Sequence, residues 1–180
     1  LYQRLAATRY RNQWLLQLVY TLWFPERPPR SRFDLLAGTL DAVVVRITLA
    51  PDDGRPLLID TIHGCGCYHL FLPTNGARLR SDAPTDVEWA FAPITLPTPQ
   101  VGQRFVIRLD SASHYAVGAT LDDGRPGKPY GLRDESVLRA LPLPQGGTRS
   151  VYGPDGLVAG SERPERFLFW PMGIASAGAM

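Results

Sequence analysis

Four side chains with metal-binding chemistry lie close together in the stretch 57–73, which reads LLIDTIHGCGCYHLFLP. The stretch contains both cysteines of the chain and two of its three histidines. They occupy every second position: His63, Cys65, Cys67 and His69. Residues two apart point to the same side of a β-strand, so an extended stretch would place all four on one face. We therefore expect the chemistry of the protein to lie here.

The four residues predict a zinc or copper site. Thiolate and imidazole suit these metals, whereas magnesium and calcium prefer oxygen ligands. Fully extended, positions 63 and 69 would lie roughly 20 Å apart, but metal–ligand distances are only about 2.0–2.3 Å. The chain must therefore curl for more than two of the four to share one ion, and Gly64 and Gly66 would permit this. His114, the third histidine, is a further candidate ligand.

Three other interpretations of the same stretch remain open. Cys65 and Cys67 could form a disulfide across Gly66, although so small a ring is strained and easily reduced. A cysteine could act as a nucleophile activated by a neighbouring histidine, with Asp60 or His114 orienting the base. The cysteines could also be small buried hydrophobic residues of an ordinary strand.

The run 62–65, Ile-His-Gly-Cys, resembles the histidine and cysteine patches of cysteine-dependent transpeptidases. The resemblance covers four residues, and the rest of the transpeptidase pattern is missing from the chain. It therefore assigns no role to any residue.

Composition predicts a folded domain built mainly from strands. The chain has 180 residues, of which 44% are hydrophobic and 20% charged, as expected for a single globular domain. Its 17 prolines and 17 glycines exclude a fold of mostly long helices. Net charge is +2, and the basic residues are scattered among 17 acidic ones, so nucleic-acid binding is not predicted.

The pattern of apolar and turn-forming residues predicts about eight short strands, arranged as a sandwich or a partly open barrel. Apolar alternation and turn residues mark the main strand candidates: 14–24, 40–49, 57–62, 87–96, 104–110 and 114–121. The segment 51–56 is a predicted hairpin turn with Asp-Gly at its centre, and 150–160 a small hairpin. One short helix is expected at 131–141, capped by Asp134. Residues 1–13 fit either a helix or an extended arm.

Two aromatic segments beside arginines predict contacts with a protein partner. One surrounds Trp23 and Phe24, and the other lies at 167–170 and includes Phe167 and Trp170, within the aromatic C-terminal segment 161–180. The longest apolar stretch, 14–25, is too short and too interrupted for a membrane span. The chain begins with Leu1 and ends at Met180, which fits a piece trimmed from a longer protein.

Three classes of function follow. The first is a metal-binding β-domain, in which zinc or copper has a structural or redox role. The second is an accessory subunit of a larger assembly, with the two cysteines bridged or buried. The third is a zinc-dependent hydrolase or a cysteine-dependent transferase, for which Asp60 and Glu88 are the nearest acids in sequence.

Overall fold

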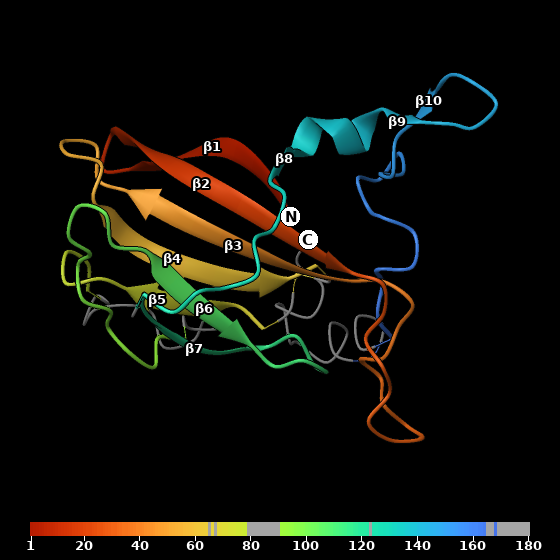
Figure 1. Ribbon diagram of the computed structural model, residues 1–180, viewed down its shortest axis with the longest axis horizontal. Coiled ribbons are helices and arrows are strands. Elements are labelled where there is room, and N and C mark those ends of the chain that lie inside the picture. The colour runs from red at the N-terminus through yellow and green to blue at the C-terminus, as the bar shows by residue number, and fades with distance from the viewer. Residues whose placement is uncertain (65, 67, 79–90, 123, 165–167, 169–180) are drawn as a thin grey trace.

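A six-stranded sheet forms the centre of the fold, with the spatial strand order β5-β4-β3-β2-β1-β8 (Figure 1). The structure is a computed structural model that describes residues 1–64, 66, 68–78, 91–122, 124–164 and 168. Neighbouring strands of the sheet are antiparallel, except that β8 pairs with β1 in parallel. The strands are β1 (Tyr2–Tyr10), β2 (Gln13–Phe24), β3 (Asp41–Leu49), β4 (Pro56–His63), β5 (Leu70–Pro73) and β8 (Arg133–Asp134).

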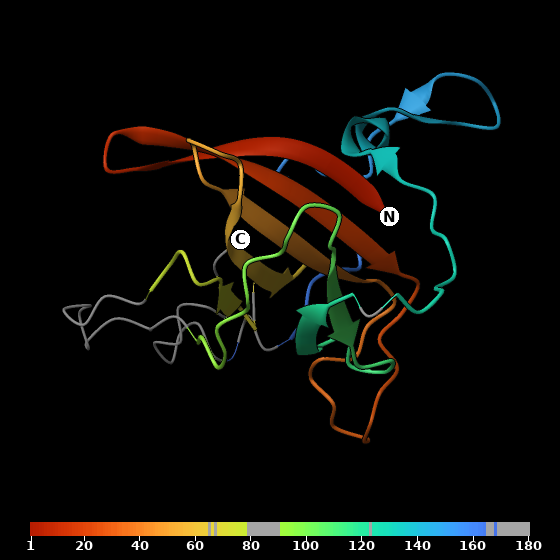
Figure 2. The ribbon, with the colours of Figure 1, turned by 60° about the vertical axis from the view of Figure 1, so that its left-hand side comes forward.

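Two smaller sheets and a short helix complete the described elements. Strands β6 (Phe105–Leu109) and β7 (Ala116–Leu121) form one hairpin, and β9 (Leu141–Pro142) pairs with β10 (Thr148–Arg149). A 3₁₀-helix, η1 (Glu135–Arg139), follows β8 directly. Figure 2 shows the large sheet curving over the β6–β7 hairpin.

The side of the large sheet that we call the core face packs against the β6–β7 hairpin. Strands β3, β4 and β5 supply alternate residues to it, including Val43, Ile59 and Leu72, and β7 supplies Ala119. Ile59 is 0% exposed, and burying a side chain of this size contributes about 1.5–3 kcal/mol. The β-branched run of β3 suits this position because branched side chains pack well on a pleated surface.

The opposite side of the sheet, which we call the groove face, carries the intervening residues of the same strands. Thr21, Val44 and Ile62 are register partners across β2, β3 and β4. Arg46 and Asp60 are register partners two residues further along β3 and β4, on the same face of the sheet. This face also contains buried side chains, Leu15 and Val19 on β2. Both faces of the central strands are therefore covered.

The prediction of a mainly β fold is confirmed, and the described residues form no closed barrel. The strands predicted at 14–24, 40–49, 57–62, 104–110 and 114–121 correspond to β2, β3, β4, β6 and β7. The predicted helix is confirmed as the shorter η1, in which the Asp134 side chain accepts a hydrogen bond from Ser136 N. Of the strand predicted at 87–96, residues 87–90 lie outside the described residues, and Phe91 and Leu96 form single bridges.

The N-terminal residues form a strand, so the helical alternative for 1–13 is wrong and the extended one is correct. All nine residues of β1 pair with β2. Arg11 and Asn12 make the connecting turn with φ values of 46° and 65°, as in the two-residue hairpin turns that suit twisted strands. Pairing with the long apolar β2 overrides the weak helical spacing of Leu1, Leu5 and Arg9.

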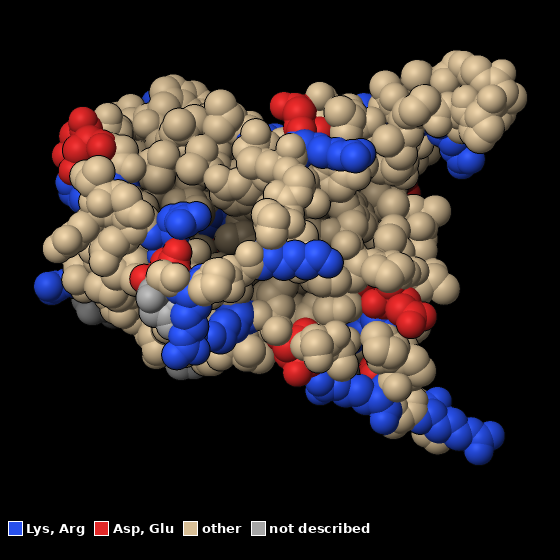
Figure 3. All heavy atoms as spheres, viewed as in Figure 1, with Lys and Arg blue, Asp and Glu red and all other residues tan. Residues whose placement is uncertain are grey.

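Charged side chains are dispersed over the surface. In Figure 3, basic and acidic groups lie next to one another at several places on the viewed face. None of the helices among the described residues is long and apolar enough to cross a membrane.

Candidate functional site

The candidate site begins where β4 ends, at His63. The chain turns after this residue: Gly66 N donates to His63 O, and Gly66 and Tyr68 have φ values of 82° and 57°. Strand β5 resumes only at Leu70. The described residues between His63 and Leu70 therefore form a turn between two paired strands and do not continue β4 as one extended strand.

This turn sends the two histidines to opposite sides of the sheet. His63 lies beside Asp41 on the core face, with 3.8 Å between Nδ1 and Oδ1. His69 lies on the groove face, where its Nε2 is 2.9 Å from Asp60 Oδ1 and 3.1 Å from Arg46 Nη2. The expectation of one shared face thus fails for this pair. Cys65 and Cys67 lie outside the described residues, so their part in a metal site stays a prediction.

Asp41 is the centre of a buried polar cluster on the core face. Its Oδ2 is 2.6 Å from His114 Nδ1, and its Oδ1 is 3.4 Å from Arg163 Nη2. Asp41, His63 and His114 are each 4% exposed, and Arg163 is 2% exposed. We call these four residues the Asp41 cluster. A buried carboxylate needs such partners because an isolated charge is strongly disfavoured in the interior.

The Asp41 carboxylate is ionised at neutral pH. Burial alone would raise its pKa, but the imidazoles of His63 and His114 and the charge of Arg163 together lower the pKa of Asp41 below its ordinary 3.8. Arg163 also donates to backbone carbonyls, among them those of Gly160 and Leu40. The cluster thus fastens residues 160–163 to the start of β3.

His63 is the least satisfied member of the cluster. Neither of its ring nitrogens has a hydrogen-bond partner among the described residues, and both are buried. The distance of 3.8 Å to Asp41 is too long for a hydrogen bond. Aromatic rings surround it, with Tyr115 at 5.0 Å and Tyr68 at 5.8 Å between ring centroids. Leaving a buried polar group unpaired costs about 1–3 kcal/mol, so a ligand for His63 would be stabilising.

Two residues of the candidate site have strained backbones. Tyr68 has a φ of 57° and His114 a φ of 58°. A side chain in this left-handed region costs roughly 1–2 kcal/mol, and such strain is typical of functional sites. His114 also stacks on Phe24 with 3.8 Å between ring centroids. Packing therefore holds the His114 ring in place from one side, and Asp41 fixes its Nδ1.

A turn closed by Asp110 presents His114 to Asp41. Asp110 Oδ1 accepts hydrogen bonds from Ser113 N and Ser113 Oγ, both at 2.7 Å, and from Ala112 N at 3.2 Å. The backbone N–H of His114 donates to Asp110 O at 2.9 Å. These bonds fix the β6–β7 connection in the shape that brings His114 inward.

We expect the Asp110 carboxyl to titrate near pH 2. The backbone N–H and the hydroxyl of Ser113 lower the pKa of Asp110 from 3.8 to about 2. Because the folded pKa is depressed, this group stabilises the fold above the unfolded value and loses that contribution as the pH falls from about 4 to about 2. Carboxyl ¹³C NMR titration measures it. The Ser113→Ala variant should raise the pKa, and an unchanged pKa in that variant would contradict the assignment.

Sequence reasoning missed two members of the cluster. Asp41 and Arg163 are 122 positions apart, and neither falls in a motif. Asp41 could have been noticed as a charge at the start of a buried strand, but its partners could not. Asp60, considered as a general base, instead binds Arg46 at 2.6 Å. Glu88 lies outside the described residues.

The predicted partner segments are described only in part. Trp23 and Phe24 are half-buried: Phe24 packs on His114, and Trp23 Nε1 is buried with no hydrogen-bond partner among the described residues. Phe167 and Trp170 lie outside the described residues. Contact with a partner through these aromatic side chains stays a prediction.

Among the described residues, no three His, Cys, Asp or Glu side chains are arranged to hold a metal ion. Comparisons with known protein families, with curated proteins and with solved structures find no match to this chain.

Proposed function

We propose that the chain is a metal-binding β-domain in which His63, Cys65 and Cys67 hold a zinc or copper ion. One observation carries the proposal: His63 is buried and neither of its ring nitrogens has a hydrogen-bond partner among the described residues. Two thiols follow within four residues of this imidazole. Thiolate and imidazole together are the ligands that both metals favour.

The position of Asp41 relative to the His63 imidazole also supports the proposal. Metal-binding histidines usually direct their second ring nitrogen to a carboxylate or carbonyl, which fixes the tautomer. Asp41 Oδ1 lies 3.8 Å from His63 Nδ1, beyond hydrogen-bond distance but near that nitrogen, so we assign Nε2 to the metal. His69 is left out of the ligand set because Asp60 and Arg46 engage its Nε2. His114 is the remaining candidate for a fourth ligand.

A structural role suits this position best. The Asp41 cluster already joins four segments that are distant in sequence: the starts of β3 and β7, the end of β4, and residues 160–163. An ion bound by His63 and the adjacent cysteines would add a cross-link at the same place. Binding only to the folded state would stabilise the domain by mass action.

Elemental analysis of the purified protein, paired with a thiol count before and after chelation, tests the proposal. We expect one equivalent of zinc or copper, and two thiols that react only after the metal is removed. Two freely titrating thiols and no metal would contradict it. No metal and no free thiol would also contradict it, and would show that Cys65 and Cys67 are bridged, as in the structural-subunit alternative.

A cysteine-dependent transferase or hydrolase is the second candidate. The distance of 2.6 Å between Asp41 Oδ2 and His114 Nδ1 favours it, because a catalytic imidazole is commonly oriented by a carboxylate in this way. The alkylation rate measured against pH separates the two. An enzyme of this kind has one metal-free thiol with a depressed pKa that alkylates fast at neutral pH.

A further inference from the structure

A groove of about 530 Å³ lies on the groove face, between the sheet and residues 152–161. Trp23, Ala42, Val44 and Ile62 form its floor from three neighbouring strands, and Leu157 and Val158 contribute to the opposite wall. Both surfaces are predominantly apolar. A cavity of this size and character is typical of small-molecule sites, which range from about 300 to 1,000 Å³.

The two ends of this groove differ in charge. At one end, Arg46 is neutralised by Asp60, with His69 beside both. At the other end, Glu135 accepts a hydrogen bond from Thr21 at 3.0 Å and pairs with Arg4 at 3.3 Å. At each end of the groove, basic and acidic side chains form ion pairs with one another. These side chains therefore do not need a charged ligand to neutralise them.

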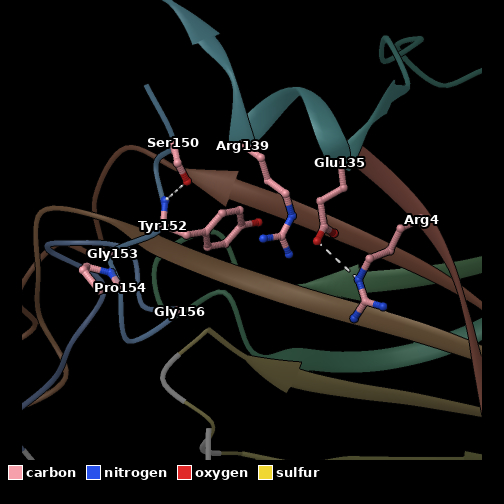
Figure 4. A pocket seen from close by; sticks show the side chains of 8 residues that line it. All are labelled: Arg4, Glu135, Arg139, Ser150, Tyr152, Gly153, Pro154 and Gly156. Atoms are coloured by element: carbon pink, nitrogen blue, oxygen red, sulfur yellow. Dashed lines mark hydrogen bonds and ion pairs between the residues drawn. The ribbon is translucent and has the colours of Figure 1, made fainter. Parts of the chain in front are cut away.

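Arg139 supplies an uncompensated positive charge next to the second end. A smaller hollow of about 430 Å³ adjoins the groove there, since both are lined by Arg4, Glu135, Tyr152 and Gly156. Figure 4 shows Arg139 and Glu135 reaching from η1 toward the hollow, with the ring of Tyr152 facing the Arg139 side chain. The guanidinium lies 5.1 Å from the centre of that ring. Arg139 makes no ion pair with any residue that the structure describes.

We propose that the groove binds a small amphipathic anion, with its head group at Arg139 and its apolar body along Val44 and Ile62. The exposed Arg139 stands at the mouth, where an oxyanion can stay partly hydrated while it pairs with the guanidinium. The apolar floor and wall then cover the remainder of the ligand. Among the described charged side chains that line the groove and the hollow, only Arg139 has no ion pair, so the charge pattern also fixes the orientation of the ligand. His63, Gly64 and Ser161 also line the groove, so one part of it borders the Asp41 cluster. The contacts proposed here, with Arg139, Val44 and Ile62, do not involve a metal.

Isothermal titration calorimetry with decanoate tests this proposal, with decanol as the neutral ligand of equal chain length. We expect decanoate to bind at one site and more tightly than decanol. Arg139→Gln should weaken decanoate binding by about tenfold or more, because a charge-assisted contact is lost, and should leave decanol binding unchanged. Arg108→Gln, on the exposed side of β6, is the matched arginine control and should alter neither.

A second test fills the groove with a larger side chain. Val44→Trp should abolish binding of both ligands, and Leu157→Trp on the facing wall serves the same purpose if the first variant does not fold. Decyl phosphate is then compared with decanoate to identify the preferred head group. The ligand that binds more tightly carries the preferred oxyanion, and tighter binding of either one supports the proposal. Equal affinity for decanoate and decanol, or binding that persists in the folded groove-filling variants, would overturn it.

Discussion

The His63→Ala variant is expected to bind zinc or copper at least about 100-fold more weakly than the unaltered protein. Loss of a residue that only orients a metal ligand typically costs 10–100-fold in affinity, so loss of a ligand itself should cost at least as much. The affinity is measured by competition with a chromophoric chelator at fixed pH. His63 is the residue to change because its buried ring nitrogens lack a partner among the described residues.

His69→Ala is the matched control for that measurement. It removes the same side chain from the same turn, but on the opposite side of the sheet, where Asp60 and Arg46 hold it. We expect its metal affinity to equal that of the unaltered protein. If both variants lost the metal equally, the assignment of ligands by sheet face would be wrong. If neither did, the ion would lie elsewhere.

Asp41→Asn is expected to lower the free energy of unfolding by about 3–5 kcal/mol, since removing one partner of a buried ion pair leaves the other charge uncompensated. That charge belongs to Arg163, which is 2% exposed. The same change weakens the contact that fixes His114 at 2.6 Å. Urea denaturation in the presence of a chelator measures the fold alone, because no metal then contributes.

Two further variants make this stability measurement decisive. Asp53→Asn changes an exposed carboxylate that pairs with Arg55 in the β3–β4 turn, and we expect no measurable loss there. Combining Asp41→Asn with Arg163→Met removes both charges and should recover part of the lost stability. A loss below about 1 kcal/mol in Asp41→Asn would show that the Asp41 cluster does not support the fold.

The alternation of apolar residues was enough to predict five of the ten described strands, but not which residues of each strand are buried. In β2, the set that includes Tyr20, Leu22 and Phe24 does face the core. The same set continues to Leu16 and Trp14, which are 46% and 67% exposed. The reason is that β3 pairs with β2 only from Gln17 onward. Where a hairpin extends beyond its neighbour depends on strand lengths across the sheet, which the pattern of one strand does not contain.

Only part of the candidate site could be predicted from the sequence, because the rest depends on tertiary structure. Residue types singled out His63 and the cysteines, and the register of β4 places His63 opposite Val43 on the core face. The positive φ of Tyr68 sends His69 to the other face, and no rule of spacing anticipates a tyrosine in that conformation. Asp41 and Arg163 meet only through tertiary packing. Long-range polar partners of this kind carry no local signal in one sequence.

X-ray absorption at the metal edge of the loaded protein tests the central claim most directly. A site made by His63, Cys65 and Cys67 predicts two sulfur neighbours at about 2.3 Å and at least one nitrogen neighbour at about 2.0 Å. In the His63→Ala variant, the imidazole contribution should fall while the sulfur shell stays. A first shell of oxygen and nitrogen without sulfur would contradict the account, because it would place the ion away from the two cysteines.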